Sequence, residues 1–266
     1  MNIIKKILVR IPMVKKILSW RRSICLIEKQ KSIHLGSVGQ KNEAFRLDWT
    51  KKQLTSLPNG LRILDAGAGE RQFKPYCRHL NYVSQDFAQY DGKGDSSGLQ
   101  LSTWDNAGLD IVSDIIAIPA PAQSFEAILC TEVIEHIPNA VLAIKEFSRL
   151  LKTGGTLIIT APFCSLTHFA PYHFSTGFNR YFYEHTLSEH GFEITEITPN
   201  GNYFEYLAQE IHRISSVASD YASDNLSEGE LLAQKTLLNA LNRFSEKDSK
   251  SSELLCFGYM VVAKKI

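Results

Sequence analysis

The distribution of apolar positions changes character at residue 61. From there on, short apolar runs of strand length alternate with stretches in which apolar residues recur every three or four positions. This alternation is typical of parallel strands joined by crossover helices. The sequence therefore predicts an α/β fold with a doubly wound, seven-stranded, mostly parallel sheet. The expected strands are residues 61–66, 81–86, 109–112, 126–131, 156–161, 192–197 and 254–263.

Two helices are expected between the later strands. The helical spacing of apolar residues is clearest over 139–151 and 180–190. Glycine commonly ends a helix, so Gly154 with Gly155 is expected to end the first helix and Gly191 the second. A strand should follow each of them.

The remaining segments divide the chain into three parts. Residues 203–246 keep helical spacing without strand signals, which predicts a helical insertion at about 199–252, before the last strand. Residues 23–60 are expected to form a helical cover for the sheet domain, 61–266. The stretch 91–108 is rich in Gly, Ser and Asp and is expected to be a loop.

The first 22 residues have a pattern of their own. They carry seven basic and no acidic side chains, and their apolar residues share one helical face. This predicts a basic amphipathic helix over 1–22 that could lie on a membrane surface or pack on its own domain, with Pro12 as a kink. No apolar run approaches the length of about 20 residues that a transmembrane helix needs.

Composition narrows the function classes. The 266 residues are 44% hydrophobic and 21% charged, and a formal net charge of +1 offers no overall field for a polyanion. The five cysteines form no C-x-x-C pair, which argues against a zinc site or a disulfide framework. Cys130 and Cys256 lie in apolar runs and are expected to be buried. A reducing cytoplasm fits this pattern.

The strongest chemical signal is the sequence RILDAGAGERQF, residues 62–73, in which a strand runs through glycines into an expected helix. Glycines allow a ligand to approach the backbone closely, which predicts a nucleotide-like ligand at residues 65–69. A nicotinamide-binding loop needs a third small residue where this chain has Gln72. An acid before the glycines instead suits a ligand with an ammonium group. The candidate ligand-binding residues here are Asp65, Ala66, Gly67, Ala68 and Gly69.

Two further acids follow neighbouring strands. Asp86 ends the second expected strand 21 residues after Asp65, close to the offset of about 20 residues at which an acid binds ribose hydroxyls. Asp114 follows the third strand. Since the carboxyl ends of parallel strands lie at one edge of a sheet, we expect all three acids around one ligand.

The series LDAGAGE, YVSQD, IVSDIIAIP, FEAILCTEVIEHI and LLKTGGTLIITAPF, spanning about residues 60–200, resembles the class I methyltransferases, in particular the group called type 11. The resemblance implies a Rossmann-like methyltransferase domain and S-adenosylmethionine as cofactor. The glycine loop would then hold the methionine part and Asp86 the ribose. Asp114 with Ile115 would hold the adenine, and Thr131 with Glu132 would lie near the methyl group.

The segment TEVIEHIP supports two interpretations. Glu132, Glu135 and His136 are spaced to share one helical face and could bind a divalent cation, with His168 or His173 as a further ligand. The string is also found in RNA 3′-end and ubiquinone-pathway O-methyltransferases, where it is linked to metal, and in many methyltransferases without one. Alternatively, His136 is a general base for an acceptor hydroxyl.

Histidines and aromatic residues crowd the segment after the fifth expected strand. APFCSLTHFAPYHFSTGFNRYFYEHTLSEHGFEI resembles a segment of methyltransferases from bacterial polysaccharide and cell-envelope pathways, where it lies on the acceptor side. Such side chains suit a sugar or planar acceptor. The candidate acceptor-side residues are His168, Tyr172, Arg180 and Tyr181, and the candidate catalytic residues are His136 and His173.

These observations predict O-methylation of a small-molecule, glycan or lipid-linked acceptor. A metal-dependent RNA 3′-end methyltransferase and a catalytically silent cofactor-binding or membrane-interaction protein are the alternatives, although the near-neutral charge argues against nucleic acid. The expected location is the cytoplasm, with residues 1–22 as a peripheral contact to the inner face of the cytoplasmic membrane.

Overall fold

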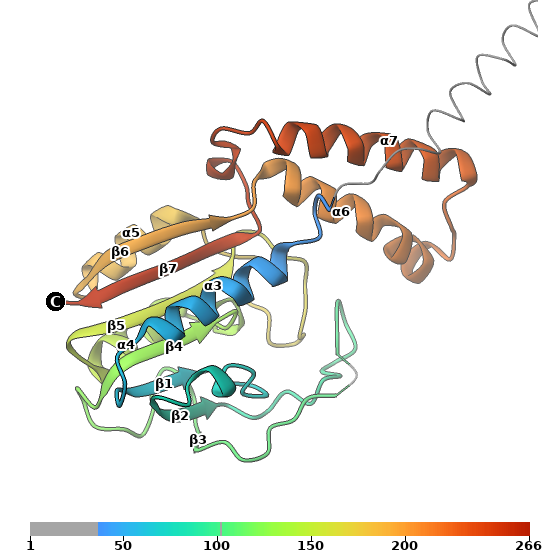
Figure 1. Cartoon of the computed structure of the whole chain (residues 1–266). Coiled ribbons are helices and arrows are strands. Elements are labelled where there is room, and N and C mark those ends of the chain that lie inside the picture. The colour runs from blue at the N-terminus through green and yellow to red at the C-terminus, as the bar shows by residue number, and fades with distance from the viewer. Residues whose placement is uncertain (1–36, 102) are drawn as a thin grey trace, which may run out of the picture.

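A computed structural model describes residues 37–101 and 103–266, and a single seven-stranded sheet forms its centre (Figure 1). The strand order is β3-β2-β1-β4-β5-β7-β6, with β7 antiparallel to both of its neighbours and every other pair parallel. The strands are β1 (Arg62–Ala66), β2 (Asn81–Asp86), β3 (Ile111–Val112), β4 (Phe125–Thr131), β5 (Leu151–Pro162), β6 (Phe192–Asn200) and β7 (Gly258–Lys265). The predicted doubly wound, mostly parallel sheet is confirmed.

Helices cover both faces of the sheet, as the burial of successive residues in β1 requires. Leu64 packs with residues of α4 (Ala140–Leu150) and α5 (Arg180–Glu189) on one face. Ile63, its neighbour, points to the other face and packs with residues of α3 (Asn42–Ser56). Because both faces are covered, the central strands are continuous apolar runs, which is why the sequence located them well.

Two predicted boundaries are wrong. Gly154 and Gly155 do not end α4, because the helix stops at Leu150 and Leu151 already has an extended backbone. Both glycines lie inside β5, whose first residue pairs with Phe125 ahead of a register shift in β4. The last strand starts four residues later than expected, since Ser251–Glu253 form the short 3-10 helix η4.

The connections at the β3 edge are also simpler than expected. No α-helix follows the glycine loop; the chain passes through turns into the 3-10 helix η1 (Lys74–Tyr76). The stretch 91–108 has no helix or extended strand among its described residues, in agreement with the predicted loop. Its one bridge pairs Leu99 with His168, which brings two loops together over the carboxyl edge of the sheet.

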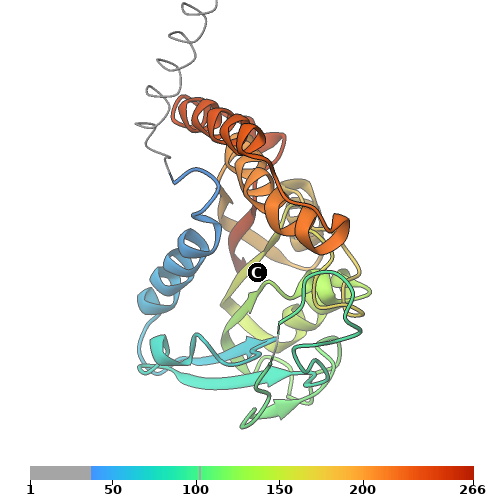
Figure 2. The ribbon, with the colours of Figure 1, turned by 90° about the vertical axis from the view of Figure 1, so that its right-hand side faces the viewer.

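The predicted helical insertion is a helical hairpin that leaves the sheet at this same edge (Figures 1 and 2). It consists of α6 (Tyr203–Val217), one turn of π-helix, η3 (Ala218–Ala222), and α7 (Glu228–Ser245). Asn202 caps α6, and Ser227 with Glu230 forms a capping box on α7. No helix among the described residues is long and apolar enough to cross a membrane.

Of the predicted N-terminal helices, the cover over 23–60 is represented by α3. The amphipathic segment 1–22 and residues 23–36 lie outside the described residues. The described chain begins against the hairpin, where Val38 packs with residues of α6 and α7. The backbone NH of Gly39 donates to Glu205 Oε2 over 2.6 Å. These contacts hold the segment that leads into α3 against the hairpin.

Candidate functional site

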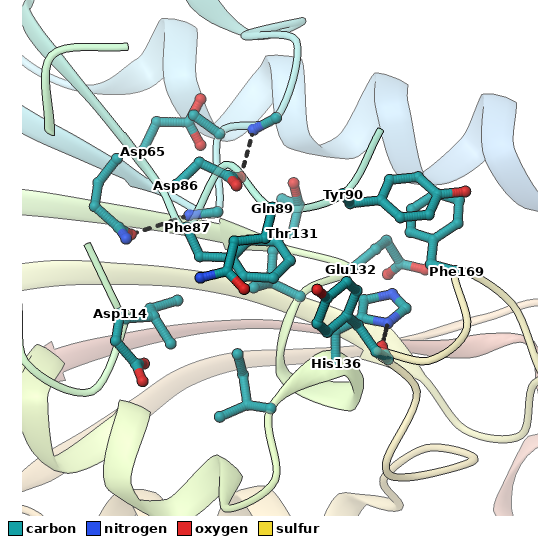
Figure 3. Close-up of a pocket in the computed structure, with 18 of the residues that line it drawn as sticks. Asp65, Asp86, Phe87, Gln89, Tyr90, Asp114, Thr131, Glu132, His136 and Phe169 are labelled. Carbon is teal, nitrogen blue, oxygen red and sulfur yellow. Dashed lines mark hydrogen bonds between the residues drawn. The ribbon is translucent and has the colours of Figure 1, made fainter. Parts of the chain in front are cut away.

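A cavity of about 950 Å³ opens at the carboxyl ends of the parallel strands (Figure 3). Its walls come from the residues that follow β1, β2, β3 and β4, from α3, and from the loops over the sheet edge. Figure 3 shows Asp65, Asp86 and Asp114 toward one end and Tyr90, His136 and Phe169 toward the other. The strand order places β1 between β2 and β4, and open α/β sheets bind ligands at such a reversal.

The glycine loop is held against β2 by its own amides. Gly67 and Ala68 donate their backbone NH groups to the carbonyl of Gln85 over 2.9 and 2.8 Å, and Gly69 donates to Asp86 Oδ2 over 2.9 Å. Gly67 and Gly69 both have a positive φ. Ala66, in contrast, is fully buried in the core and does not line the cavity.

No residue larger than glycine fits at either glycine. A Cβ at Gly67 would stand 2.4 Å from Val133 Cγ2, and one at Gly69 would stand 2.4 Å from a ring carbon of Trp104. The side chains of Val133 and Trp104 therefore pack directly against the two glycines, which line the cavity without side chains of their own. A ligand can approach this loop at van der Waals distance.

Asp65 is the most deeply buried acid of the ligand end. It is 2% exposed, and the hydroxyl of Tyr82 donates to its Oδ2 over 2.5 Å. Burial raises the pKa of Asp65 to about 7, against the opposing effect of the Tyr82 hydrogen bond, and the neighbouring Asp86 adds to the rise. A cation beside this carboxyl would favour its ionised form.

Asp86 and Asp114 lie at the same edge, as expected. Asp86 accepts hydrogen bonds from Gly69 and, over 2.9 Å, from the backbone NH of Ala88. Asp114 accepts from the backbone NH of Ile116 over 3.1 Å, and its exposed carboxylate lines the cavity together with buried Ile115. The structure thus brings all three predicted acids to one cavity from three different strand ends.

Thr131 ends β4 and Glu132 follows it. Both line the cavity, but Glu132 is not in a helix. It has a φ of +55°, its Oε1 accepts from the Thr160 hydroxyl over 2.8 Å, and its Oε2 lies 3.2 Å from Arg46 Nη1. The expectation that Glu132, Glu135 and His136 share one helical face is wrong. Only the single 3-10 turn η2 (Ile134–His136) forms here, and Glu132 instead ties α3 to the sheet.

His136 lies at the other end of the cavity in a fixed tautomer. Its Nδ1 is 2.5 Å from the carbonyl oxygen of Tyr172, so Nδ1 carries the proton and donates it. Its ring stacks on Phe169 at 5.3 Å between centroids and 18° between planes. Burial, reinforced by His168 and His173, lowers the pKa of His136 to about 4. The imidazole is therefore neutral near pH 7.

His168 and His173 gather around His136. The ring centroids of His168 and His173 lie 4.7 and 6.0 Å from that of His136, and 4.8 Å from each other. Tyr172 lines the cavity and meets the ring of Phe87 edge-on at 4.9 Å. The acceptor-side candidates His168 and Tyr172 and the catalytic candidate His173 therefore lie close to His136.

Arg180 and Tyr181 do not line the cavity. They are the first two residues of α5, which Asn179 caps. Arg180 forms ion pairs with Glu184 and with Glu253, at 3.2 and 2.8 Å, and Tyr181 is 63% exposed. Their expected role on the acceptor side is therefore corrected: they begin the next helix.

The sequence did not single out the aromatic wall of the cavity, which consists of Tyr90, Trp104 and Phe169. Tyr90 stacks on Phe169 at 4.6 Å, and the Trp104 ring lies 5.8 and 5.5 Å from these two rings. These side chains come from loops without periodicity, so only their aromatic character could have marked them. Arg46, on α3, was missed because nothing local links it to Glu132.

One protein family, described as a methyltransferase domain, has a model that matches residues 40–197, more than half of the chain. The chain belongs to this methyltransferase family. Its sheet order and glycine loop are those expected of a class I methyltransferase dependent on S-adenosylmethionine.

The similar proteins share the domain rather than the whole chain. The ubiquinone biosynthesis O-methyltransferase of Xylella fastidiosa is 28% identical over 123 residues, which cover 43% of this chain and 46% of that protein. Its namesake from Xanthomonas oryzae pv. oryzae is 30% identical over 118 residues, covering 43% and 48%. The methyltransferase thus spans about half the length of the curated relatives that it matches.

Solved structures resemble the methyltransferase more distantly. Phosphoethanolamine N-methyltransferase 2 of Haemonchus contortus, in complex with S-adenosyl-L-methionine, is 18% identical with a TM-score of 0.44, covering 80% of this chain and 50% of that chain. A geranyl diphosphate methyltransferase is 11% identical with a TM-score of 0.48, covering 84% and 79%. Likeness at this level carries no information about the acceptor.

The described residues fit S-adenosylmethionine. The bare backbone at Gly67 and Gly69 admits a closely packed ligand, and the buried carboxyl of Asp65 offers a partner for the ammonium group. Asp86 and Asp114 line the same cavity and offer further carboxylate acceptors.

We expect Gly67→Ala to weaken binding of S-adenosylmethionine and S-adenosylhomocysteine by at least about tenfold, because the new methyl group collides with Val133 and shifts the loop. The matched control is Gly154→Ala, which has nearly the same φ, +77° against +76°, but nothing within 4 Å of the new Cβ. Calorimetry on both variants is the measurement. Equal affinities would contradict a close ligand approach at Gly67.

We expect cofactor affinity to rise as the pH is raised through about 7, because the ammonium group of the cofactor favours ionised Asp65. Asp65→Asn should flatten this pH dependence and bind more weakly at pH 8. In the protein without ligand, the pKa of Asp65 is higher in the folded state than in the unfolded state. Its contribution to the free energy of unfolding should therefore decrease as the pH rises from 3.8 to about 7, and Asp65→Asn should lack this decrease. Calorimetry and thermal unfolding across this range are the measurements; a pH dependence retained by the variant would contradict the assignment.

Proposed function

We propose that this methyltransferase transfers the methyl group of S-adenosylmethionine to an oxygen of a small acceptor. The observation that carries the proposal is the continuity of the cavity. One space joins the glycine loop and the three acids to the end where His136, Tyr172 and Phe169 lie. Its volume of about 950 Å³ lies at the upper end of the usual range for small-molecule sites, with room for an acceptor beside the cofactor.

The residues at the acid end are assigned to the cofactor. Gly67, Ala68 and Gly69 would contact its methionine part, with Asp65 as the partner of the ammonium group. Asp86 would accept hydrogen bonds from the ribose hydroxyls. Asp114 and Ile115 would bind the adenine, the first through its amine and the second through the ring. Thr131 and Glu132 would lie near the reactive methyl group.

The reaction depends more on the position of the acceptor oxygen relative to the methyl group than on chemical activation of the methyl donor. An oxygen lone pair attacks the methyl carbon in line with the carbon–sulfur bond; the new oxygen–carbon bond forms while the old bond's electrons stay on sulfur, giving S-adenosylhomocysteine. Aromatic faces such as those of Phe87, Tyr90 and Phe169 favour a sulfonium cation nearby. The acceptor's proton has to leave to a nearby base.

The histidine cluster is the proposed destination of that proton. His136 has a neutral ring facing the cavity and would contact the acceptor oxygen. His173 is partly exposed, and its Nε2 lies 3.2 Å from Ser165 Oγ, so it can pass a proton on to water. These two histidines are the proposed catalytic residues, with His168 and Tyr172 beside them.

The proposed acceptor is a small molecule, a glycan or a lipid-linked compound. The curated relatives are named as O-methyltransferases of ubiquinone biosynthesis, which supports oxygen as the methylated atom. The aromatic wall formed by Tyr90, Trp104 and Phe169 suits a planar ring or a sugar face. Nucleic acid is not a proposed acceptor, because the chain has a net charge of only +1.

We expect purified protein to form S-adenosylhomocysteine and to add one methyl group to an acceptor from a panel of phenols, sugars and lipid-linked alcohols. His173→Ala should lower kcat about 100-fold or more, while cofactor affinity stays unchanged because His173 does not line the cavity. The control is His185→Ala, a histidine that is exposed on α5. Tight cofactor binding without turnover on any acceptor would instead favour a catalytically silent cofactor-binding protein.

Residues 1–22 are proposed to hold the enzyme near a membrane-borne acceptor. Their seven basic side chains would attract an anionic surface, and the apolar face would enter it. We expect deletion of residues 1–22 to release the protein from anionic liposomes in a flotation assay. Binding that is unchanged by the deletion would refute this proposal and leave the methyl-transfer proposal intact.

A further inference from the structure

Two adjacent side chains on η2 bury polar atoms that have no hydrogen-bond partner within the described part of the chain. Glu135 is fully buried, and neither of its carboxyl oxygens is hydrogen-bonded. Nε2 of His136 is buried and unpartnered as well. It lies 3.8 Å from Glu135 Oε1, too far for a direct hydrogen bond. Buried polar atoms are almost always paired, so three orphans at one point indicate a missing partner.

The imidazoles around this point are oriented by the backbone. His136 donates its Nδ1 proton to the carbonyl of Tyr172, and His168 donates its own to the carbonyl of Leu166 over 2.9 Å. With Nδ1 donating in this way, the nitrogen of each ring that is left to bind a metal is Nε2. Histidines that bind metals are held in this way, with one nitrogen fixed by a carbonyl and the other free.

We propose that Glu135, His136 and His168 bind one divalent transition-metal cation, of the zinc type, at the acceptor end of the cavity. One donor atom from each residue lies within 4.8 Å of the other two. Metal–donor distances of about 2.0–2.2 Å place donors roughly 3.3 Å apart, so small side-chain rotations complete the site. Two imidazoles with one carboxylate favour zinc, cobalt or iron over magnesium or calcium.

This ligand set differs from the one that the sequence suggested. Glu132 is not among the three ligands, because its carboxylate is occupied by the Thr160 hydroxyl and by Arg46. His168 replaces it and comes from the loop after β5, more than 30 residues further along the chain. The loop is fixed here because the backbone NH groups of Phe174 and Ser175 donate to the carbonyl of Glu135.

The cation would deepen the proposed function, on which this step rests. Three protein ligands leave a further coordination position. Of the three, His136 lines the cavity, so the acceptor would approach the cation past its ring. An acceptor hydroxyl beside a divalent cation loses its proton more readily. With the cation bound, Nε2 of His136 is a ligand and no longer the base. His173 is not a ligand, its ring centroid lies 4.8 Å from that of His168, and it would receive the proton instead.

The experiment is a titration of the full-length, chelator-treated protein with Co²⁺, followed by visible absorption and by competition with Zn²⁺, without cofactor or acceptor. We expect one cation per chain. Glu135→Gln and His168→Ala should each weaken binding by about 100-fold or more, since even residues behind the ligands change affinity 10–100-fold. His173→Ala and His185→Ala should bind Co²⁺ as the unaltered protein does, and thermal unfolding checks that every variant is folded.

Absence of a stoichiometric Co²⁺ complex would overturn the proposal, and so would Co²⁺ binding that survives both Glu135→Gln and His168→Ala in folded protein. Loss of Co²⁺ binding in His185→Ala would show that the cation binds at the exposed His185, and this result would also refute the proposal. Calorimetry of S-adenosylmethionine on the same metal-free sample tests the methyltransferase function separately. Cofactor binding without Co²⁺ binding would therefore leave the proposed function standing and remove only the metal site.

Discussion

Parallel pairing of β1 with β2 on one side and with β4 on the other is the constraint on which the site depends. The chain leaves β1 and β4 at the same sheet edge, and the order β3-β2-β1-β4-β5 reverses its direction between them. A crevice opens at that point without any special side chain. Hydrogen bonds from the backbone NH groups of the glycine loop to Gln85 and Asp86 hold the loop against the end of β2. The sheet therefore positions both the loop and Asp86.

The sequence could predict the fold because the sheet is covered on both faces. Strands such as β1 and β4 are buried on both sides, and their continuous apolar runs identify them in the sequence. Local capping rules were less reliable where tertiary contacts decide. Gly154 and Gly155 have the composition of a helix end, yet pairing with β4 draws the chain into a strand from Leu151 onward. Strand pairing between β4 and β5 therefore outweighed the local preference of the two glycines for a helix end.

The cavity likewise has one end that the sequence could predict and one that it could not. Asp65, Asp86 and Asp114 could be predicted to meet because each lies at or near the end of a strand, and parallel strands fix where their ends lie. The acceptor end is built by loops, and its contacts join distant segments. Leu99 donates its backbone NH to Thr167 and accepts from the NH of Phe169, an arrangement that no local pattern encodes. Residue type and the resemblance could therefore identify the histidines as candidates but could not separate those near the cavity from Arg180 and Tyr181.

A buried carboxyl group lies near each end of the cavity: Asp65 lines one end, and Glu135 lies next to His136 at the other. Burial raises the pKa of Asp65 to about 7 and that of Glu135 well above its usual value, although Tyr82 donates a hydrogen bond to Asp65. Groups placed in this way destabilise the empty protein, and a positive partner removes the penalty. An ammonium group at Asp65 and a cation at Glu135 would each be such a partner. Ligand binding and folding stability are thus coupled through these two acids, at opposite ends of one cavity.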